Sequence, residues 1–291
     1  MEKTQDVKLD FSVLDKEELA LLKSQTGIEN MEELREHVES VVGKAHNVFR
    51  YECLTRLVFL KSKYPRLPAY KHVLELGKSR EDTLFLDIGC CFGHDTRKAV
   101  WDGYPIQNII ASDLYPEFWD LGHELFKSTP ETFPVPFIPG DIFDDHFIPD
   151  RMPVMKTSTT ERPSLQSLAS SKSLAPLQGH ISAIHASALF HLFREEPQRR
   201  IAKKLASLLS PVPGSVIFGL HRGLPEAREI QNVGKAKDTI FGHSPASWKK
   251  LWAGGETEEG VFPPHTVEVD ASITQIPGTD VHMLAWSVTR I

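Results

Sequence analysis

Five short apolar runs, each about the length of one buried strand, alternate with helix-like segments through the chain. The runs cover residues 83–87, 109–113, 135–139, 180–185 and 214–219. Helix-like segments follow at 94–100, 116–127, 197–209 and 245–252. This alternation is typical of a mostly parallel sheet covered by helices on both faces. The first three runs lead into Asp87, Asp113 and Asp141. We therefore expect these acids to meet at the carboxyl edge of the sheet.

Two final apolar runs, at 266–276 and 281–288, have no helix between them. Pro277 and Gly278 form a turn signal that joins them, so this pair should be antiparallel. Residues 81–291 therefore predict an α/β fold: a Rossmann-like, mostly parallel seven-stranded sheet with an antiparallel last strand. Residues 150–179 interrupt the alternation with Ser, Thr, Pro, Lys and Gln, which predicts a mobile insertion in this domain.

Residues 1–80 show no strand pattern and predict an N-terminal helical cap. Asn30, with Glu33 three positions later, matches the capping pattern of a helix start. The amphipathic run at 48–60 predicts a further helix that stops before Pro65.

Composition argues against nucleic acid or a membrane as a partner. The 291 residues carry a net charge of −6, which favours a small-molecule substrate over a polyanion. The three cysteines cannot build a disulfide framework, and no zinc-ligand spacing predicts a metal site. No stretch reaches the roughly 18 apolar residues of a membrane span, and the N-terminus lacks a signal-peptide core, so we expect a cytoplasmic location.

The segment Leu84–Gly93 carries the pattern Asp-x-Gly-x-x-x-Gly directly after the first apolar run. A glycine-rich turn at this place lets the backbone approach a ligand. A dinucleotide pyrophosphate would favour Gly-x-Gly-x-x-Gly and is poorly served by an acid before the turn. Because Asp87 precedes the turn, the charge favours a cationic cofactor. S-adenosylmethionine, with its ammonium and sulfonium groups, fits that requirement.

The next two acids extend this hypothesis. Asp113 follows Asp87 by 26 positions, close to the offset of about 20 residues at which an acid binds ribose hydroxyls. Asp141 ends the third run, where an adenine amino group could be bound. Each acid alone is as readily a helix cap or a turn residue. Three acids at successive strand ends make a ligand site the better interpretation.

Three further segments carry a family resemblance: residues 185–193 (HASALFHLF), 219–223 (GLHRG) and 243–252 (HSPASWKKLW). With the turn at Leu84–Gly93, they make the chain resemble the Rossmann-like S-adenosylmethionine-dependent methyltransferases over residues 83–219. More narrowly, the chain is similar to a fungal natural-product group that includes carboxyl O-methyltransferases of meroterpenoid pathways.

The resemblance implies a role for each matching residue. The turn residues Asp87, Gly89, Cys90 and Gly93 would lie near the methionine part of the cofactor. Asp113 and Leu114 would lie at the ribose, Asp141 and Ile142 at the adenine, and His185 would close the pocket. Cys90-Cys91-Phe92 is bulkier than the small residues common in such turns.

The residues allow two kinds of methyl acceptor. A carboxylate needs no base, whereas a phenol or alcohol would benefit from one. His185 and His191 are the candidate catalytic residues, with His221 a third, and each could equally be a packed histidine. The predicted function is S-adenosylmethionine-dependent O-methylation of a hydrophobic secondary metabolite, by a possible homodimer. The alternatives are a nicotinamide-dependent oxidoreductase and a non-catalytic interaction protein with a methyltransferase fold.

Overall fold

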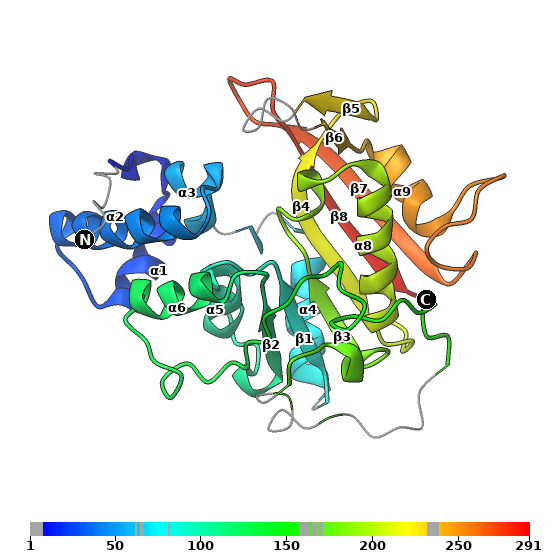
Figure 1. Ribbon diagram of the computed structural model, residues 1–291, viewed down its shortest axis with the longest axis horizontal. Helices are drawn as coiled ribbons and strands as arrows, with labels where there is room; N and C mark the ends of the chain where they lie inside the picture. Colours follow the sequence, from blue (N-terminus) through cyan, green and yellow to red (C-terminus); the bar gives the residue numbers. More distant parts are fainter. Residues whose placement is uncertain are drawn as a thin grey trace.

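The computed structural model describes residues 8–61, 63–64, 67–80, 82–156, 163, 168, 171–231 and 239–291. A central sheet divides the molecule, and the N-terminal helices group beside α6 at the end of the sheet that carries β2 (Figure 1). The elements that matter for function lie where these two parts meet.

The main sheet has the strand order β2-β1-β3-β4-β8-β7. Its strands are β1 (Leu84–Ile88), β2 (Ile109–Ser112), β3 (Ile181–His185), β4 (Val216–Gly223), β7 (Val267–Gln275) and β8 (His282–Arg290). The first four run parallel, and β8 pairs antiparallel with both β4 and β7. The predicted α/β fold, mostly parallel with antiparallel strands at the C-terminus, is therefore confirmed.

The expected count of seven strands is wrong for the described residues, because the main sheet has six. Residues 135–139 form a single parallel bridge between Phe137 and Ala111 rather than a strand. Ala111 N donates to Pro136 O and Ile138 N donates to Ala111 O, each at 2.9 Å. Pro136 and Pro139 have no N–H to extend the ladder, so pairing stops at the edge of the sheet. A separate antiparallel pair of β5 (Arg228–Gln231), which is mostly exposed, and β6 (Thr239–Gly242), which is half-buried, was not predicted.

Helices cover both faces of the sheet. They are α4 (Ala69–Ser79), α5 (His94–Trp101), α6 (Pro116–Leu125), α8 (Glu195–Leu208) and α9 (Pro245–Ala253), with the 3₁₀ turns η4 (Ile106–Asn108), η5 (Ala175–Leu177) and η6 (Phe190–Leu192). Two further 3₁₀ turns, η1 (Phe11–Val13) and η2 (Val58–Leu60), belong to the N-terminal cluster described below. Alternate β1 residues enter different core clusters: Leu84 and Leu86 pack with α8 and α9, whereas Phe85 packs with α4. We call these the α8 face and the α4 face.

The N-terminal helices build a third core cluster. They are α1 (Lys16–Thr26), α2 (Met31–Val48) and α3 (Glu52–Thr55), and α2 packs on α6. The predicted continuous helix over 48–60 is wrong. Phe49 is extended, and Leu57 has the left-handed φ of 52°. The break lets Leu54, Leu57 and Leu60 all enter the same apolar cluster, so tertiary burial outweighs local helix preference.

The segment predicted as a mobile insertion, residues 150–179, is described only in part. Leu168, Leu174 and Leu177 are buried in the cluster on the α8 face. Residues 157–162, 164–167 and 169–170 lie outside the described residues. These three leucines anchor the segment to the sheet domain, whereas Met152 and Met155 are exposed.

Close packing between α6 and the glycine turn gives a first prediction. A Cβ on Gly122 would lie 2.3 Å from Phe92 O. We expect Gly122→Ala to lower the free energy of unfolding by about 1–3 kcal/mol through overpacking, although alanine favours helix. Chemical denaturation measures the change. Gly255→Ala is the control, because its Cβ would come no closer than 3.4 Å to another residue. Equal stability of both variants and wild type would contradict this packing.

Candidate functional site

Asp87 lies at the carboxyl end of β1 with its carboxylate fully engaged. One oxygen accepts a hydrogen bond from Thr96 Oγ1 at 2.6 Å, and the other lies 2.8 Å from His185 Nδ1. The residue is only 1% exposed. A buried carboxylate is costly without partners, so Thr96 and His185 stabilise its charge. This joins β1 to α5 and to β3.

His185 extends the same network toward β4. Its Nε2 lies 2.6 Å from Ser187 Oγ, which accepts from Leu220 N at 3.0 Å. A neutral imidazole that donates from Nδ1 to Asp87 and accepts at Nε2 from the Ser187 hydroxyl satisfies every group. Both ring nitrogens are thus engaged within the protein.

The turn after β1 is held in a conformation that favours glycine. Gly89 and Gly93 have φ values of 74° and 71°, and Cys91, at 51°, is also left-handed. The amides of Gly89 and Cys90 both donate to Ser112 O, at 2.8 and 3.2 Å. A Cβ on Gly93 would lie 2.6 Å from Trp119, whereas one on Gly89 would meet nothing closer than Leu189 at 3.8 Å. The backbone is therefore packed at Gly93 and open at Gly89.

Asp113 ties this turn to β2. Its two oxygens accept from Cys91 N at 2.8 Å and from Tyr115 N at 3.1 Å. Burial raises the pKa of Asp113, and these backbone hydrogen bonds act against the increase. Each oxygen keeps a lone pair for a further donor such as a ribose hydroxyl. The neighbouring Leu114 side chain is 49% exposed.

Asp141 lies on the next loop along the same edge. Gly140 N donates to Asp113 O at 3.0 Å, which joins the two loops. Asp141 itself is exposed, and its side chain accepts from Phe143 N at 2.9 Å, while Ile142 is buried on the α8 face. The structure therefore lines the predicted acids along one edge of the sheet.

Sequence reasoning missed several polar residues of this edge. Thr96 and Ser187 complete the network around Asp87 and His185. Lys63 forms a largely buried ion pair with Asp95, and Asp95 Oδ1 is buried without a hydrogen-bond partner among the described residues. The only local signal was for Ser187, which lies inside the 185–193 segment.

The cap also contributes aromatic groups next to Asp113. The Phe49 and Tyr115 rings stack with centroids 5.8 Å apart, and Tyr51 contacts Phe118 at 5.7 Å. Burial, and secondly the Asp113 carboxylate, raise the pKa of the Tyr51 phenol. The N-terminal helices therefore reach the carboxyl edge of the sheet.

His191 lies in a different environment from His185. Its ring centroid is 6.4 Å from that of His221, which packs 4.7 Å from Trp248 on the α8 face. His221 Nδ1 accepts from Trp286 Nε1 at 2.9 Å. Burial, followed by the Arg222 charge, lowers the pKa of His191 to about 4, and burial lowers the pKa of His221. These rings are neutral at physiological pH. The two predicted catalytic histidines thus belong to different clusters: His185 to the Asp87 network and His191 to the rings around His221.

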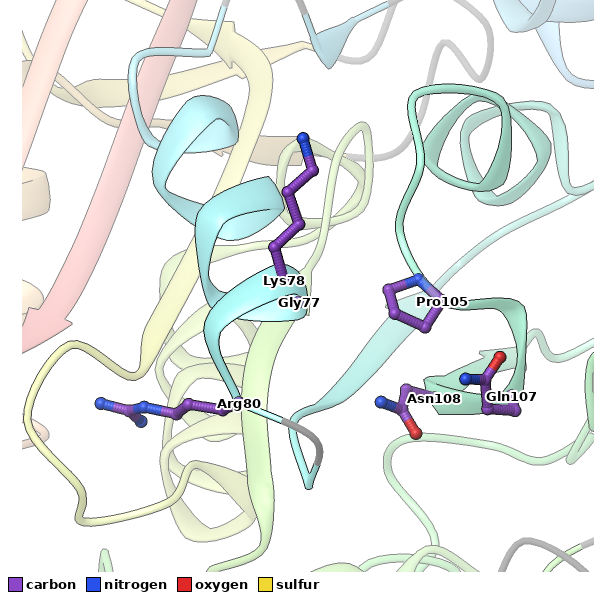
Figure 2. A pocket seen from close by; sticks show the side chains of 6 residues that line it. All are labelled: Gly77, Lys78, Arg80, Pro105, Gln107 and Asn108. Atoms are coloured by element: carbon purple, nitrogen blue, oxygen red, sulfur yellow. The ribbon is translucent and has the colours of Figure 1, made fainter.

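A separate hollow lies at the opposite edge of the sheet, beside the segments that lead into β1 and β2 (Figure 2). It is lined by Gly77, Lys78, Arg80, Pro105, Gln107 and Asn108. Ligands of open α/β sheets bind beyond the carboxyl ends of the strands, so this hollow is not the expected cofactor site.

The carboxyl edge fits a cofactor with a cationic group, a ribose and an adenine. The fit rests on the buried unpartnered oxygen of Asp95, the free lone pairs of Asp113 and the open backbone at Gly89. Among the described residues, no three His, Cys, Asp or Glu side chains gather as metal ligands. In the same part of the chain, no helix is both long and apolar enough to cross a membrane.

Comparison with known proteins places this geometry in a family. Residues 7–60 match a family model described as the meroterpenoid methyltransferase N-terminal domain. O-methyltransferase phiE of a fungal species is 32% identical over 229 residues, which cover 79% of this chain and 67% of phiE. The asnovolin E/chermesin D methyltransferase nvfJ of Aspergillus novofumigatus is 30% identical over 264 residues, covering 89% and 83%.

Solved structures agree on the fold. A 1,6-didemethyltoxoflavin-N1-methyltransferase of Burkholderia thailandensis, solved with bound 1,6-didemethyltoxoflavin and S-adenosylhomocysteine, superposes with a TM-score of 0.51 at 14% identity. The alignment covers 86% of this chain and 88% of that one. The sheet is therefore that of an S-adenosylmethionine-dependent methyltransferase fold.

The buried His94, next to Gly93, gives a prediction for pH. It is 3% exposed, neither ring nitrogen has a partner in the described residues, and burial lowers its pKa to about 4. An unfolded histidine titrates near pH 6.5, so the unfolded state binds more protons between these values. The contribution of the neutral His94 ring to the free energy of unfolding is therefore fully present above that range and is lost as pH decreases through it.

Between pH 7 and pH 5, we expect the free energy of unfolding to fall by about 1–2 kcal/mol less in His94→Phe than in wild type. Urea unfolding at both pH values measures the difference. The exposed His146→Gln is the control and should keep the wild-type loss. A His94→Phe protein with the wild-type loss would show that His94 is not buried as a neutral ring.

Proposed function

Since the chain belongs to the fungal meroterpenoid methyltransferase family, we propose that it transfers a methyl group from S-adenosylmethionine to an oxygen of a small hydrophobic secondary metabolite. The observation that carries this proposal is the acid–glycine turn, which is hydrogen-bonded to Asp113 directly after β2 and, through Asp87, to His185 on β3. This arrangement gives one edge of the sheet a backbone opening beside two carboxylates.

The cofactor roles of individual residues are part of the proposal. Gly89, Cys90 and Gly93 would border the methionine part, Asp113 and Leu114 the ribose, and Asp141 and Ile142 the adenine. Bound S-adenosylmethionine supplies an electrophilic methyl group. The chain's own residues would orient the donor and exclude water. Asp87 and His185 would act mainly by holding this edge rigid, because each is already paired.

We further propose that the acceptor oxygen is a carboxylate. His185 has no free ring nitrogen, and the lowered pKa of His191 makes it a weak base near neutral pH. A carboxylate needs no base, so this edge suits it better than a phenol or alcohol. The relative phiE is named an O-methyltransferase, which supports an oxygen acceptor.

The alternative functions have less support. A nicotinamide-dependent oxidoreductase would need the third glycine of a dinucleotide turn, which this chain lacks. A non-catalytic interaction protein is not favoured, because the relatives are named methyltransferases.

Location and organisation remain proposals. We propose a cytoplasmic enzyme with a possible homodimeric assembly and without nucleic-acid or membrane partners. We also propose the division into an N-terminal cap, residues 1–80, and a Rossmann-like domain, residues 81–291. The helix α4 packs on the sheet, so by its contacts it associates with the second unit.

The ribose role of Asp113 can be tested by calorimetry with S-adenosylhomocysteine. We expect Asp113→Ala to weaken binding by about 1.5–3 kcal/mol, the range for hydrogen bonds to a charged group. Asp120→Ala, an exposed acid on α6, is the control and should bind like wild type. NADH run in parallel should not bind. Wild-type affinity in Asp113→Ala would remove Asp113 from the ribose, and NADH binding would favour the oxidoreductase.

Turnover against pH separates the two acceptor types. Asnovolin E, the compound in the name of nvfJ, is the first probe to test. With a carboxylate acceptor, His185→Gln and His191→Gln should give flat profiles above the acceptor's own pKa, because no proton is removed. Loss of a true base would instead reduce turnover by roughly 10²–10⁴-fold, with recovery at higher pH. Such a loss in either variant would refute the carboxylate proposal.

A further inference from the structure

Lys63 and Asp95 form an ion pair beside the glycine turn. Lys63 Nζ lies 2.6 Å from Asp95 Oδ2, and the two side chains are 17% and 8% exposed. Burial lowers the pKa of Lys63, but the Asp95 carboxylate and then that of Asp87 outweigh it, so the net pKa is raised. Burial raises the pKa of Asp95, and Lys63 more than reverses this. Both groups are therefore charged.

The position of the pair follows from how the chain is anchored. Asp95 is the second residue of α5, which begins directly after Gly93. Lys63 precedes Tyr64, whose fully buried ring stacks on Tyr70 at 4.2 Å and meets the edge of His185 at 4.9 Å. The tyrosine holds the N-terminal segment against β3, so Lys63 lies at the same edge as the turn.

The pair is incomplete within the protein. Asp95 is 6% exposed, yet its Oδ1 has no hydrogen-bond partner in the described residues. A buried charged oxygen without a donor is costly, so a ligand that supplies one would bind favourably here. Asp87, the other acid of this turn, already accepts from Thr96 and His185. The carboxylate at the turn with an unpartnered oxygen is therefore that of Asp95, although its charge is paired with Lys63.

We propose that Lys63 and Asp95 together bind the amino-acid end of the cofactor. This inference rests on the proposed function, since it requires S-adenosylmethionine or its demethylated product as the ligand. The amino-acid end is a zwitterion with one carboxylate and one ammonium. Lys63 Nζ donates to the carboxylate, and Asp95 Oδ1 accepts from the ammonium. A lysine from the N-terminal segment and an acid of the sheet domain thus share one ligand group.

Two ligands separate this role from a general effect on the site. S-adenosylhomocysteine carries the amino-acid group, and 5′-methylthioadenosine has the same adenosine and thioether without it. Calorimetry on the full chain measures both affinities for wild type, Lys63→Gln and Asp95→Asn. We expect each variant to bind S-adenosylhomocysteine about 10–100-fold more weakly, the loss of a charge-assisted hydrogen bond. Affinity for 5′-methylthioadenosine should stay within about twofold of wild type.

The controls make each outcome decisive. Lys98→Gln removes another lysine of an ion pair, the one that Lys98 of α5 forms with the C-cap residue Asp102, and should change neither affinity. If Asp95→Asn does not fold, Lys63→Gln and the charge-retaining Lys63→Arg decide, with Arg expected to recover most of the affinity. An unchanged ratio of the two affinities in Lys63→Gln would overturn the inference and leave the cofactor assignment standing. A wild-type protein that binds neither ligand would overturn both.

Discussion

The hydrogen bond between Asp87 and His185 is the contact on which the candidate site depends. It joins β1 to β3 at residues 98 positions apart, inside the protein and at 2.8 Å. Thr96 adds α5 to the same carboxylate, and Ser187 extends the network to the backbone of β4. A buried carboxylate keeps its hydrogen-bond partners in place. The network therefore fixes the positions of β1, β3, β4 and the start of α5 relative to one another. The turn between β1 and α5 inherits that rigidity.

The elements predicted correctly are those whose signal is local. β1 and β2 are short apolar runs with an acid at the carboxyl end, so Asp87 and Asp113 could be placed at strand ends without knowing the pairing. Asp141 could be placed in the same way after the run at 135–139, although that run forms only a bridge. The glycine turn is local as well, since left-handed φ values at Gly89 and Gly93 belong to single residues. The edge strand at 135–139 was over-predicted, because two prolines limit it to one bridge.

The features that were not predicted depend on contacts between distant residues. Lys63 and Asp95 are separated by 32 positions, and neither stands in a pattern that names its partner. The helix expected over 48–60 breaks at Leu57 because the third core cluster takes apolar residues from both sides of the break. β5 is mostly exposed and has Ile230 as its one apolar residue, so it lacks the apolar alternation by which a strand is recognised. In each of these places, contacts between residues distant in sequence decide the structure, and the neighbouring residues alone do not predict it.

The two faces of the sheet carry different kinds of polar group. On the α4 face, the Asp87 carboxylate accepts from Thr96 and lies against His185, and Lys63 and Asp95 form an ion pair. On the α8 face, His191 and His221 are held neutral by burial among aromatic rings. Charged groups suit the zwitterionic, cationic donor that we propose, whereas the packed aromatic rings keep the neutral histidines within the core. Methyl transfer to a carboxylate then needs no proton removed by the protein. The main contribution left to the chain is to hold the donor and the acceptor in line.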